Sequence, residues 1–157
     1  MAIEIGQTIP DVKLKTPDGK DLSTTELCRG KRVVLFAVPG AFTPTCSDQH
    51  LPSFVERAND IKARGIDTIA CVAVNDHFVM GAWGNARGVG DKILMLADGN
   101  GDFARAMGLE MDSRAFGLGI RSRRYAALIE DCVIKDLKVD QPGRFEVSSA
   151  EVLLKSL

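Results

Sequence analysis

The sequence predicts an α/β fold: a three-layer sandwich in which helices cover both faces of a mixed central sheet. Two observations support this prediction. Short runs of β-branched and aliphatic residues alternate with helical patterns over the first two thirds of the chain, as in parallel strands joined by helices. The last third changes to two adjacent strand patterns and a final helix, which adds antiparallel strands to the sheet.

The first half of the chain supplies one short strand, one central strand and a long helix. Residues 12–15 resemble a strand, and the Pro-Asp-Gly turn at 17–19 closes it. The continuous apolar run 33–38 predicts a buried central strand that ends at the following Pro-Gly pair. From about Pro44 apolar residues recur at helical spacing, and Gly65 is well placed to end that helix. The predicted apolar face consists of Leu51, Phe54, Val55, Ala58 and Ile61.

Two more strands follow, each succeeded by a helix. Residues 66–74 predict a second buried strand, after which Asn75 or Asp76 caps a helix. Residues 93–97 predict a third strand, followed by a glycine-rich turn and a short helix near 103–107. The apolar residues of the first of these helices are Phe78, Val79, Ala82 and Trp83.

The C-terminal third predicts an antiparallel hairpin and a last helix. Residues 125–129 and 132–139 flank Glu130-Asp131, which we interpret as the hairpin turn. Ser148 or Ser149 then caps a helix whose apolar side includes Val152, Leu153 and Leu157. The complete order of elements predicts a sandwich of thioredoxin-like type, formed as one domain by residues 1–157.

The composition is that of an ordinary globular chain and excludes two classes of partner. Of 157 residues, 45% are hydrophobic, which is enough for one domain with a buried core. The 20 Lys and Arg residues are balanced by 21 Asp and Glu residues, so there is no overall basic surface for nucleic acid. The longest aliphatic runs are far shorter than the roughly 20 residues of a membrane span, and no signal-peptide pattern opens the sequence. We therefore expect a cytoplasmic protein without nucleic-acid or membrane partners.

Four cysteines, at positions 28, 46, 71 and 132, are too few and too widely spaced for a disulfide scaffold. Cys46 has the most informative surroundings, because a predicted buried strand leads into a tight loop that delivers it to the first turn of a long helix. Pro44 suits that turn, where its missing N–H would have no partner. A thiolate at this position faces unpaired backbone N–H groups and the positive end of the helix dipole.

A helix N-terminus alone does not make a thiol reactive at neutral pH. An ordinary cysteine, with a pKa of about 8.5, is only about 3% ionised at pH 7, and lowering the pKa to near 6 requires roughly 3.4 kcal/mol. The helix supplies about 0.3–1 kcal/mol and at most about 2, so a cation is also needed. Arg124, just before the predicted strand 125–129, is the candidate, because a guanidinium stays charged and presents several donors. Thr43 offers a hydroxyl to the sulfur or to a bound oxygen. The alternative is that residues 121–124 form a solvated basic loop.

Three motifs identify a family resemblance: Pro-Gly-Ala-Phe-Thr-Pro-Thr-Cys-Ser at 39–47, Val-Asn-Asp-His-Phe-Val-Met-Gly-Ala-Trp at 74–83, and Gly-Leu-Gly-Ile-Arg-Ser-Arg-Arg-Tyr at 117–125. They resemble the peroxiredoxins, specifically the type II, peroxiredoxin-5-like subfamily, and the similarity extends over nearly the whole chain. That family reduces hydrogen peroxide and alkyl hydroperoxides without metal or flavin. The resemblance therefore implies a thiol-dependent peroxidase, active in redox homeostasis and oxidative stress defence, that needs no cofactor.

The resemblance also implies roles for individual residues. Cys46 is the expected peroxidatic cysteine, which attacks the peroxide and becomes a sulfenic acid. Thr43 and Arg124 are expected to position the peroxide and stabilise the departing oxygen, while Pro39 shields the sulfur from solvent. A homodimer is implied as well. The apolar residues that either form its contact or simply fill the core are Phe42, Phe78, Trp83 and Leu118.

The sequence leaves the second half of the reaction open. A sulfenic acid is reduced either by a second thiol of the protein or by an external one. In animal relatives the resolving cysteine lies near the C-terminus, where this chain has Ser148, whereas in plant-type relatives it corresponds to Cys71. The two alternatives are an internal Cys46–Cys71 disulfide, reduced by thioredoxin, and direct reduction by glutathione and glutaredoxin. The first requires the start of the helix to unwind, which Pro52 favours by removing one helical hydrogen bond.

Competing patterns are weaker. No C-x-x-C motif is present, which argues against a thioredoxin-style dithiol oxidoreductase, and Cys46 with His50 makes no full metal site in a chain with two histidines. Residues 98–104 imitate dinucleotide and calcium loops, but Asp102 would repel a pyrophosphate and Phe103 stands where calcium loops need glycine, so we interpret them as turn and helix-cap chemistry. A redox sensor that signals through Cys46 oxidation, and a binding module without a reactive thiol, remain alternative functions. Cys28 and Cys132 have no predicted role in the reaction.

Overall fold

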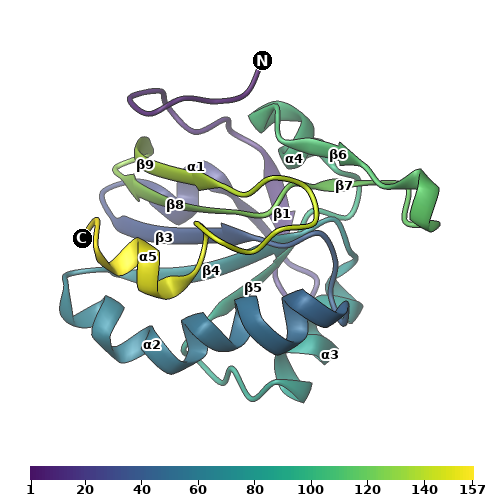
Figure 1. The fold of residues 1–157 in the computed structure, drawn as a ribbon. Helices are drawn as coiled ribbons and strands as arrows, with labels where there is room; N and C mark the ends of the chain where they lie inside the picture. The colour runs from purple at the N-terminus through teal and green to yellow at the C-terminus, as the bar shows by residue number, and fades with distance from the viewer.

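In a computed structural model that describes residues 1–157, a seven-stranded mixed sheet lies between two layers of helices (Figure 1). The strand order is β2-β1-β5-β4-β3-β8-β9, with β3, β4 and β5 parallel and the other pairs antiparallel. The predicted three-layer α/β fold of thioredoxin-like type is confirmed. The strands of this sheet are β1 (Lys13–Lys15), β2 (Asp21–Ser23), β3 (Arg32–Ala37), β4 (Thr68–Ala73), β5 (Leu94–Ala97), β8 (Tyr125–Glu130) and β9 (Val133–Val139).

The helices divide between the two faces of the sheet. Helices α2, α3 and α5 pack on one face, and α1 and α4 contribute their apolar residues to the core on the other. A separate two-stranded hairpin projects from the molecule beside α4 (Figure 1). The helices are α1 (Thr24–Cys28), α2 (Leu51–Ala63), α3 (His77–Ala86), α4 (Asp102–Met107) and α5 (Ala150–Leu154); the projecting hairpin consists of β6 (Glu110–Asp112), a 3₁₀ turn (Arg114–Phe116) and β7 (Ile120–Ser122).

Alternation along the central strands creates two hydrophobic cores. Successive side chains of a strand point to opposite faces, so Phe36 joins the 22-residue core beneath α2 while its neighbour Leu35 joins the 17-residue core on the other side. The same alternation in β4 turns Cys71 towards the α2 side and Val72 away from it. Cys46 belongs to the same core as Cys71.

The helix caps follow the predicted chemistry. Asp76 caps α3, because its carboxylate accepts a hydrogen bond of 2.8 Å from the Val79 N–H. Ser149, rather than Ser148, caps α5 through the Val152 N–H at 3.2 Å. Gly65 follows α2 with a φ of +87°, a left-handed conformation that ends a helix at little cost for glycine.

Several sequence-based boundaries were wrong. The hairpin turn consists of Asp131 and Cys132, both with positive φ, while Glu130 still pairs with Val133; two left-handed residues fit the twist of a tight hairpin. Strand β4 begins at Thr68 rather than at residue 66, because the preceding Asp67 carboxylate accepts the Arg32 N–H at 2.9 Å.

The shortest elements were not predicted. Strand β2, helix α1 and the β6–β7 hairpin contain only three to five residues per element, too few for either periodicity to show. None of the helices combines the length with the apolar composition that a membrane-spanning segment needs.

Candidate active site

The loop after β3 brings Cys46 to a turn with unusual helical geometry. Residues 46–50 form a π turn in which the Leu51 N–H donates to the Cys46 carbonyl, five residues earlier. Pro52 follows directly and has no N–H, so the regular hydrogen-bond ladder is interrupted at this point of the helix. Cys46 itself is fully buried.

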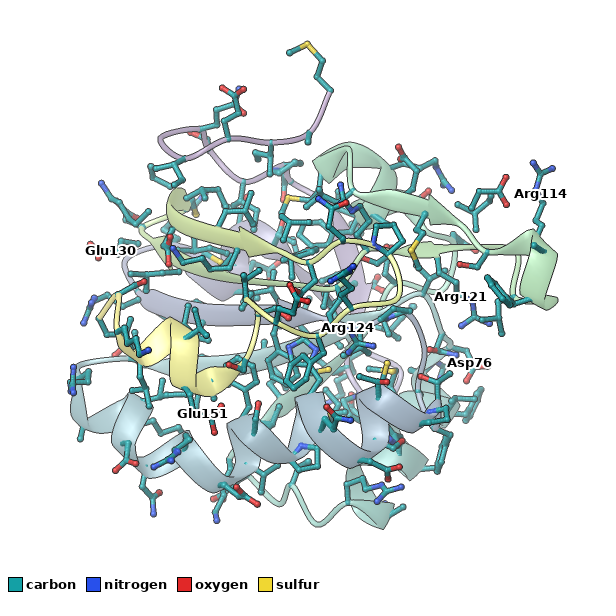
Figure 2. All side chains as sticks on the ribbon, in the orientation of Figure 1. Asp76, Arg114, Arg121, Arg124, Glu130 and Glu151 are labelled. Atoms are coloured by element: carbon teal, nitrogen blue, oxygen red, sulfur yellow. The ribbon has the colours of Figure 1, made fainter.

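Arg124 provides the positive charge at the sulfur. Its Nη2 donates a hydrogen bond to Cys46 Sγ at 3.2 Å across 78 positions of sequence. Arg124 directly precedes β8 and is 8% exposed. Figure 2 shows its side chain in the middle of the molecule, between the start of the long helix and the segment that joins β9 to α5. The guanidinium therefore places a buried positive charge directly against the sulfur.

His50 holds the other nitrogen of the same guanidinium. The Arg124 Nη1 lies 2.9 Å from His50 Nδ1, and the His50 Nε2 lies 2.9 Å from the Ser148 carbonyl oxygen. A guanidinium can only donate, so Nδ1 accepts and the ring proton resides on Nε2, which donates to Ser148. Burial, assisted by the charge of Arg124, lowers the pKa of His50 to about 3. The imidazole is therefore neutral at physiological pH.

His50 was missed as a site residue by the sequence reasoning, which weighed it only as a metal ligand with Cys46. The structure contains no group of three or more His, Cys, Asp or Glu side chains that could hold a metal ion. The signal that could have found it is the spacing of four residues from Cys46, which directs both side chains of the turn towards Arg124.

Thr43 lies in the loop just before the cysteine. Its hydroxyl donates to the Gly40 carbonyl at 2.7 Å, and its own carbonyl accepts the Ser47 N–H at 2.9 Å. With its hydrogen used in this way, the Thr43 oxygen is left as an acceptor, suited to the O–H of a bound hydroperoxide. No hydrogen bond joins Thr43 directly to the sulfur.

Asn75 holds this loop and Arg121 lies against it, and neither was assigned that role from the sequence. The Asn75 side chain accepts the Ala41 N–H at 3.0 Å. Arg121 donates to the Val74 carbonyl at 3.0 Å, and its Nη1 would lie 3.4 Å from a Cβ added at Gly40. The absence of a side chain at Gly40 thus lets the guanidinium lie against the active-site loop.

A pocket of about 490 Å³ opens beside Arg124. Its walls combine polar groups near the guanidinium with apolar side chains of the β6–β7 hairpin. Pro39 forms part of the wall, whereas Cys46 and Thr43 do not line the pocket. The lining residues are Pro39, Thr45, Met111, Asp112, Ser113, Phe116, Leu118, Arg124, Asp140, Gln141, Pro142, Gly143 and Arg144.

All four cysteines are free thiols. Cys71 is completely buried in β4. This burial, together with a smaller effect of the nearby Cys46, raises the pKa of Cys71 well above the usual value. Burial also raises the pKa of Cys28 to about 12, and burial raises that of Cys132. Both lie in or against the core on the far side of the sheet, away from Cys46.

The four apolar residues considered for a dimer contact do not behave alike. Trp83 is fully buried, and its indole N–H donates to the Ser47 hydroxyl at 2.9 Å, so the structure excludes it from a surface contact. Phe78 is 75% exposed and Phe42 is 51% exposed. Leu118 is half-buried.

The loop-like residues 98–104 form a helix cap. The two carboxylate oxygens of Asp98 accept the N–H groups of Phe103 and Ala104 at 3.0 and 2.9 Å, at the start of α4. This confirms the interpretation as turn and cap chemistry rather than a ligand loop.

Comparison with known proteins gives consistent matches along the chain. Residues 4–154 match the family model described as Redoxin. The chain is 50% identical to "Peroxiredoxin-2E-2, chloroplastic" of Oryza sativa subsp. japonica, covering 99% of this chain and 72% of that protein. It is 44% identical to "Peroxiredoxin-2B" of Arabidopsis thaliana, covering 99% and 98%. The crystal structure of reduced Prx3 in complex with H2O2 from Vibrio vulnificus superposes with a TM-score of 0.95 at 52% identity, covering 99% of each chain.

Proposed function

Since the chain belongs to the type II, peroxiredoxin-5-like peroxiredoxins of the Redoxin family, and is thus a thiol peroxidase with an antioxidant function, we propose that Cys46 is the thiol it uses. The observation that supports this assignment is the 3.2 Å hydrogen bond from Arg124 to Cys46 Sγ. No other cysteine has a cation bonded to its sulfur, and burial raises the pKa of the other three.

The proposed chemistry follows from the groups around the sulfur. The Cys46 thiolate attacks one peroxide oxygen, the O–O bond breaks, and the other oxygen takes a proton and leaves as water or an alcohol. Arg124 stabilises the negative charge that develops on the leaving oxygen. Thr43 accepts a hydrogen bond from the peroxide, and Pro39 limits the access of water to the sulfur.

We propose hydrogen peroxide and alkyl hydroperoxides as substrates. The pocket beside Arg124 has room for an organic group, and its apolar side chains Met111, Phe116 and Leu118 would cover an alkyl chain.

Two routes of re-reduction remain proposals. In one, the Cys46 sulfenic acid condenses with Cys71, releasing water, and thioredoxin reduces the disulfide. In the other, glutathione attacks the sulfenic acid and glutaredoxin completes the reduction. The first route benefits from the shared core of the two cysteines but requires rearrangement, because Cys71 is fully buried within β4. The second requires only that a small thiol reach Cys46.

We also propose a homodimer and a cytoplasmic location. The exposed rings of Phe42 and Phe78 support an apolar contact near the active-site loop.

The experiment that tests the proposed function compares the wild type with Cys46→Ser. Peroxide consumption with a thiol donor should be lost in the variant, while its circular dichroism and thermal unfolding stay close to wild type. Cys28→Ser serves as the matched control, since it also removes a buried thiol and should retain activity. Peroxidase activity that survives in Cys46→Ser would refute the assignment.

A further inference from the structure

Figure 2 shows the segment between β9 and α5 beside the Arg124 side chain. We call residues 140–148 the strap. Its Phe145 ring lies 5.0 Å from the His50 ring, and the Arg124 guanidinium carbon lies 5.8 Å from the same phenyl ring. Its last residue, Ser148, accepts the Nε2–H of His50 through its carbonyl oxygen. The strap thus contacts both groups that surround the sulfur.

One buried carboxylate closes the strap. Asp140, which is 3% exposed, accepts the N–H groups of Glu146 and Val147 on Oδ1, both at 2.9 Å. On Oδ2 it accepts the N–H of Ser148 at 3.2 Å and the Ser148 hydroxyl. No cation pairs with it. All four bonds reach the far end of the strap, so this carboxylate fixes the position of the Ser148 backbone.

A continuous chain of hydrogen bonds leads from this carboxylate to the sulfur. Asp140 holds Ser148, whose carbonyl holds the Nε2–H of His50. The His50 Nδ1 then accepts from Arg124, which donates its other terminal nitrogen to Cys46 Sγ. Each member has the donor or acceptor that its neighbour requires, and every link lies in the buried interior.

We propose that Asp140 is a positioning residue for the peroxidase reaction: it orients the Arg124 guanidinium on the Cys46 sulfur through Ser148 and His50. This inference rests on the proposed function of Cys46 and Arg124. Its sequence position, 94 residues from Cys46 and outside all three family-like motifs, gives no indication of such a role.

The change Asp140→Asn tests the chain at one link. The amide has nearly the size of the carboxylate, and its oxygen retains the bonds from Glu146 and Val147. Its NH2 group, however, faces the N–H of Ser148, so donor meets donor where an acceptor stood. The disturbance falls on the residue whose carbonyl orients His50.

The measurement is the second-order rate constant of Cys46 oxidation by hydrogen peroxide, obtained by rapid mixing, alkylation of unreacted thiol and mass spectrometry. We expect Asp140→Asn to lower this constant about tenfold, as for the loss of one buried hydrogen bond. Asp136→Asn is the matched control: it removes a largely buried carboxylate from the same strand, β9, but one paired with Lys138 and not with the strap. It should change the constant less than twofold.

A double-mutant cycle separates positioning from general destabilisation. If Asp140 acts through the guanidinium, Asp140→Asn should have no further effect in an Arg124→Ala background. The nitrogen chemical shifts of His50 should show a single Nε2–H tautomer in the wild type and a mixture in Asp140→Asn. The proposal would be overturned if Asp140→Asn slowed the reaction equally in the wild-type and Arg124→Ala backgrounds, or if it did not slow the reaction in the wild-type background.

A second variant decides the matter should Asp140→Asn fail to fold. Ser148→Ala preserves the carbonyl that binds His50 and removes only one bond to Asp140, so a reduction of about threefold, abolished by Arg124→Ala, is expected. Unchanged kinetics there would count against the proposal. Wild-type protein whose Cys46 does not react with peroxide would instead overturn the proposed function itself, and this inference with it.

Discussion

Replacing Arg124 by alanine removes a cation that is bonded at two points. Its Nη2 donates to Cys46 Sγ at 3.2 Å and its Nη1 to His50 Nδ1 at 2.9 Å. A hydrogen bond to a charged group contributes about 1.5–3 kcal/mol, and each 1.4 kcal/mol corresponds to about tenfold in rate, so loss of the sulfur contact alone slows the reaction about ten- to hundredfold. Loss of charge stabilisation at the leaving oxygen adds about 100-fold or more.

The assay should therefore show a second-order rate constant for Cys46 oxidation that falls by at least about 1,000-fold in Arg124→Ala. Arg124→Lys should recover only part of the rate, since a single ammonium cannot reproduce the fork that joins Cys46 to His50. Arg114→Ala, which removes an exposed arginine paired with Asp112, should behave as wild type.

The result that would refute this reasoning is specific. Arg124→Ala and Arg124→Lys with the same rate constant as wild type would mean that the guanidinium is only a structural filler beneath the strap. If Arg124→Ala lost activity because it unfolded, the rate constant of Arg124→Lys would decide the question, since lysine keeps the positive charge and most of the side-chain length.

Three further predictions concern reduction, pH and assembly. Cys71→Ser should stop turnover supported by thioredoxin if the internal disulfide forms, while turnover with glutathione and glutaredoxin should continue; equal rates in both assays would exclude Cys71 as the resolving thiol. Because the pKa of His50 is lowered in the folded state, the unfolded chain binds a proton at a pH where the folded chain does not. The free energy of unfolding should therefore decrease as the pH falls from about 6.5 towards 3. His50→Gln should flatten this dependence in denaturant titrations. Phe78→Glu should shift a dimer towards monomer in analytical ultracentrifugation without changing the fold, and an unaltered dimer would remove Phe78 from the contact.

The fold was largely predictable because its central strands are continuous apolar runs. Residues 33–38 and 66–74 have only one physical use, burial between two helical layers, and the helical spacing after Pro44 supplies one of those layers. The hairpin turn was displaced by one residue, since Asp131-Cys132 carries no glycine to reveal its positive φ. The three-residue strands of the β6–β7 hairpin are too short to show a period.

The site was predictable only in part, for a related reason. A helix N-terminus alone cannot ionise an ordinary thiol at neutral pH, so a cation was expected beside Cys46. Arg124 was the candidate because it directly precedes a predicted strand. The groups that hold Arg124 could not be recognised in the same way. The bond from His50 to the Ser148 carbonyl joins residues 98 positions apart. Its acceptor is a backbone group, which every residue has, so no residue type in the sequence indicates it. The π turn likewise depends on how residues 46–50 meet the core.

The hydrogen bond between Trp83 and Ser47 gives the protein an optical reporter of its own chemistry. Trp83 is the single tryptophan, so the indole emission comes from one site, and its N–H is bonded to the residue next to Cys46. Unwinding of the helix start, which a Cys46–Cys71 disulfide requires, would break that bond and expose the ring to a more polar environment. Intrinsic fluorescence, recorded without label or coupled enzyme, should therefore follow the formation and reduction of this disulfide in real time.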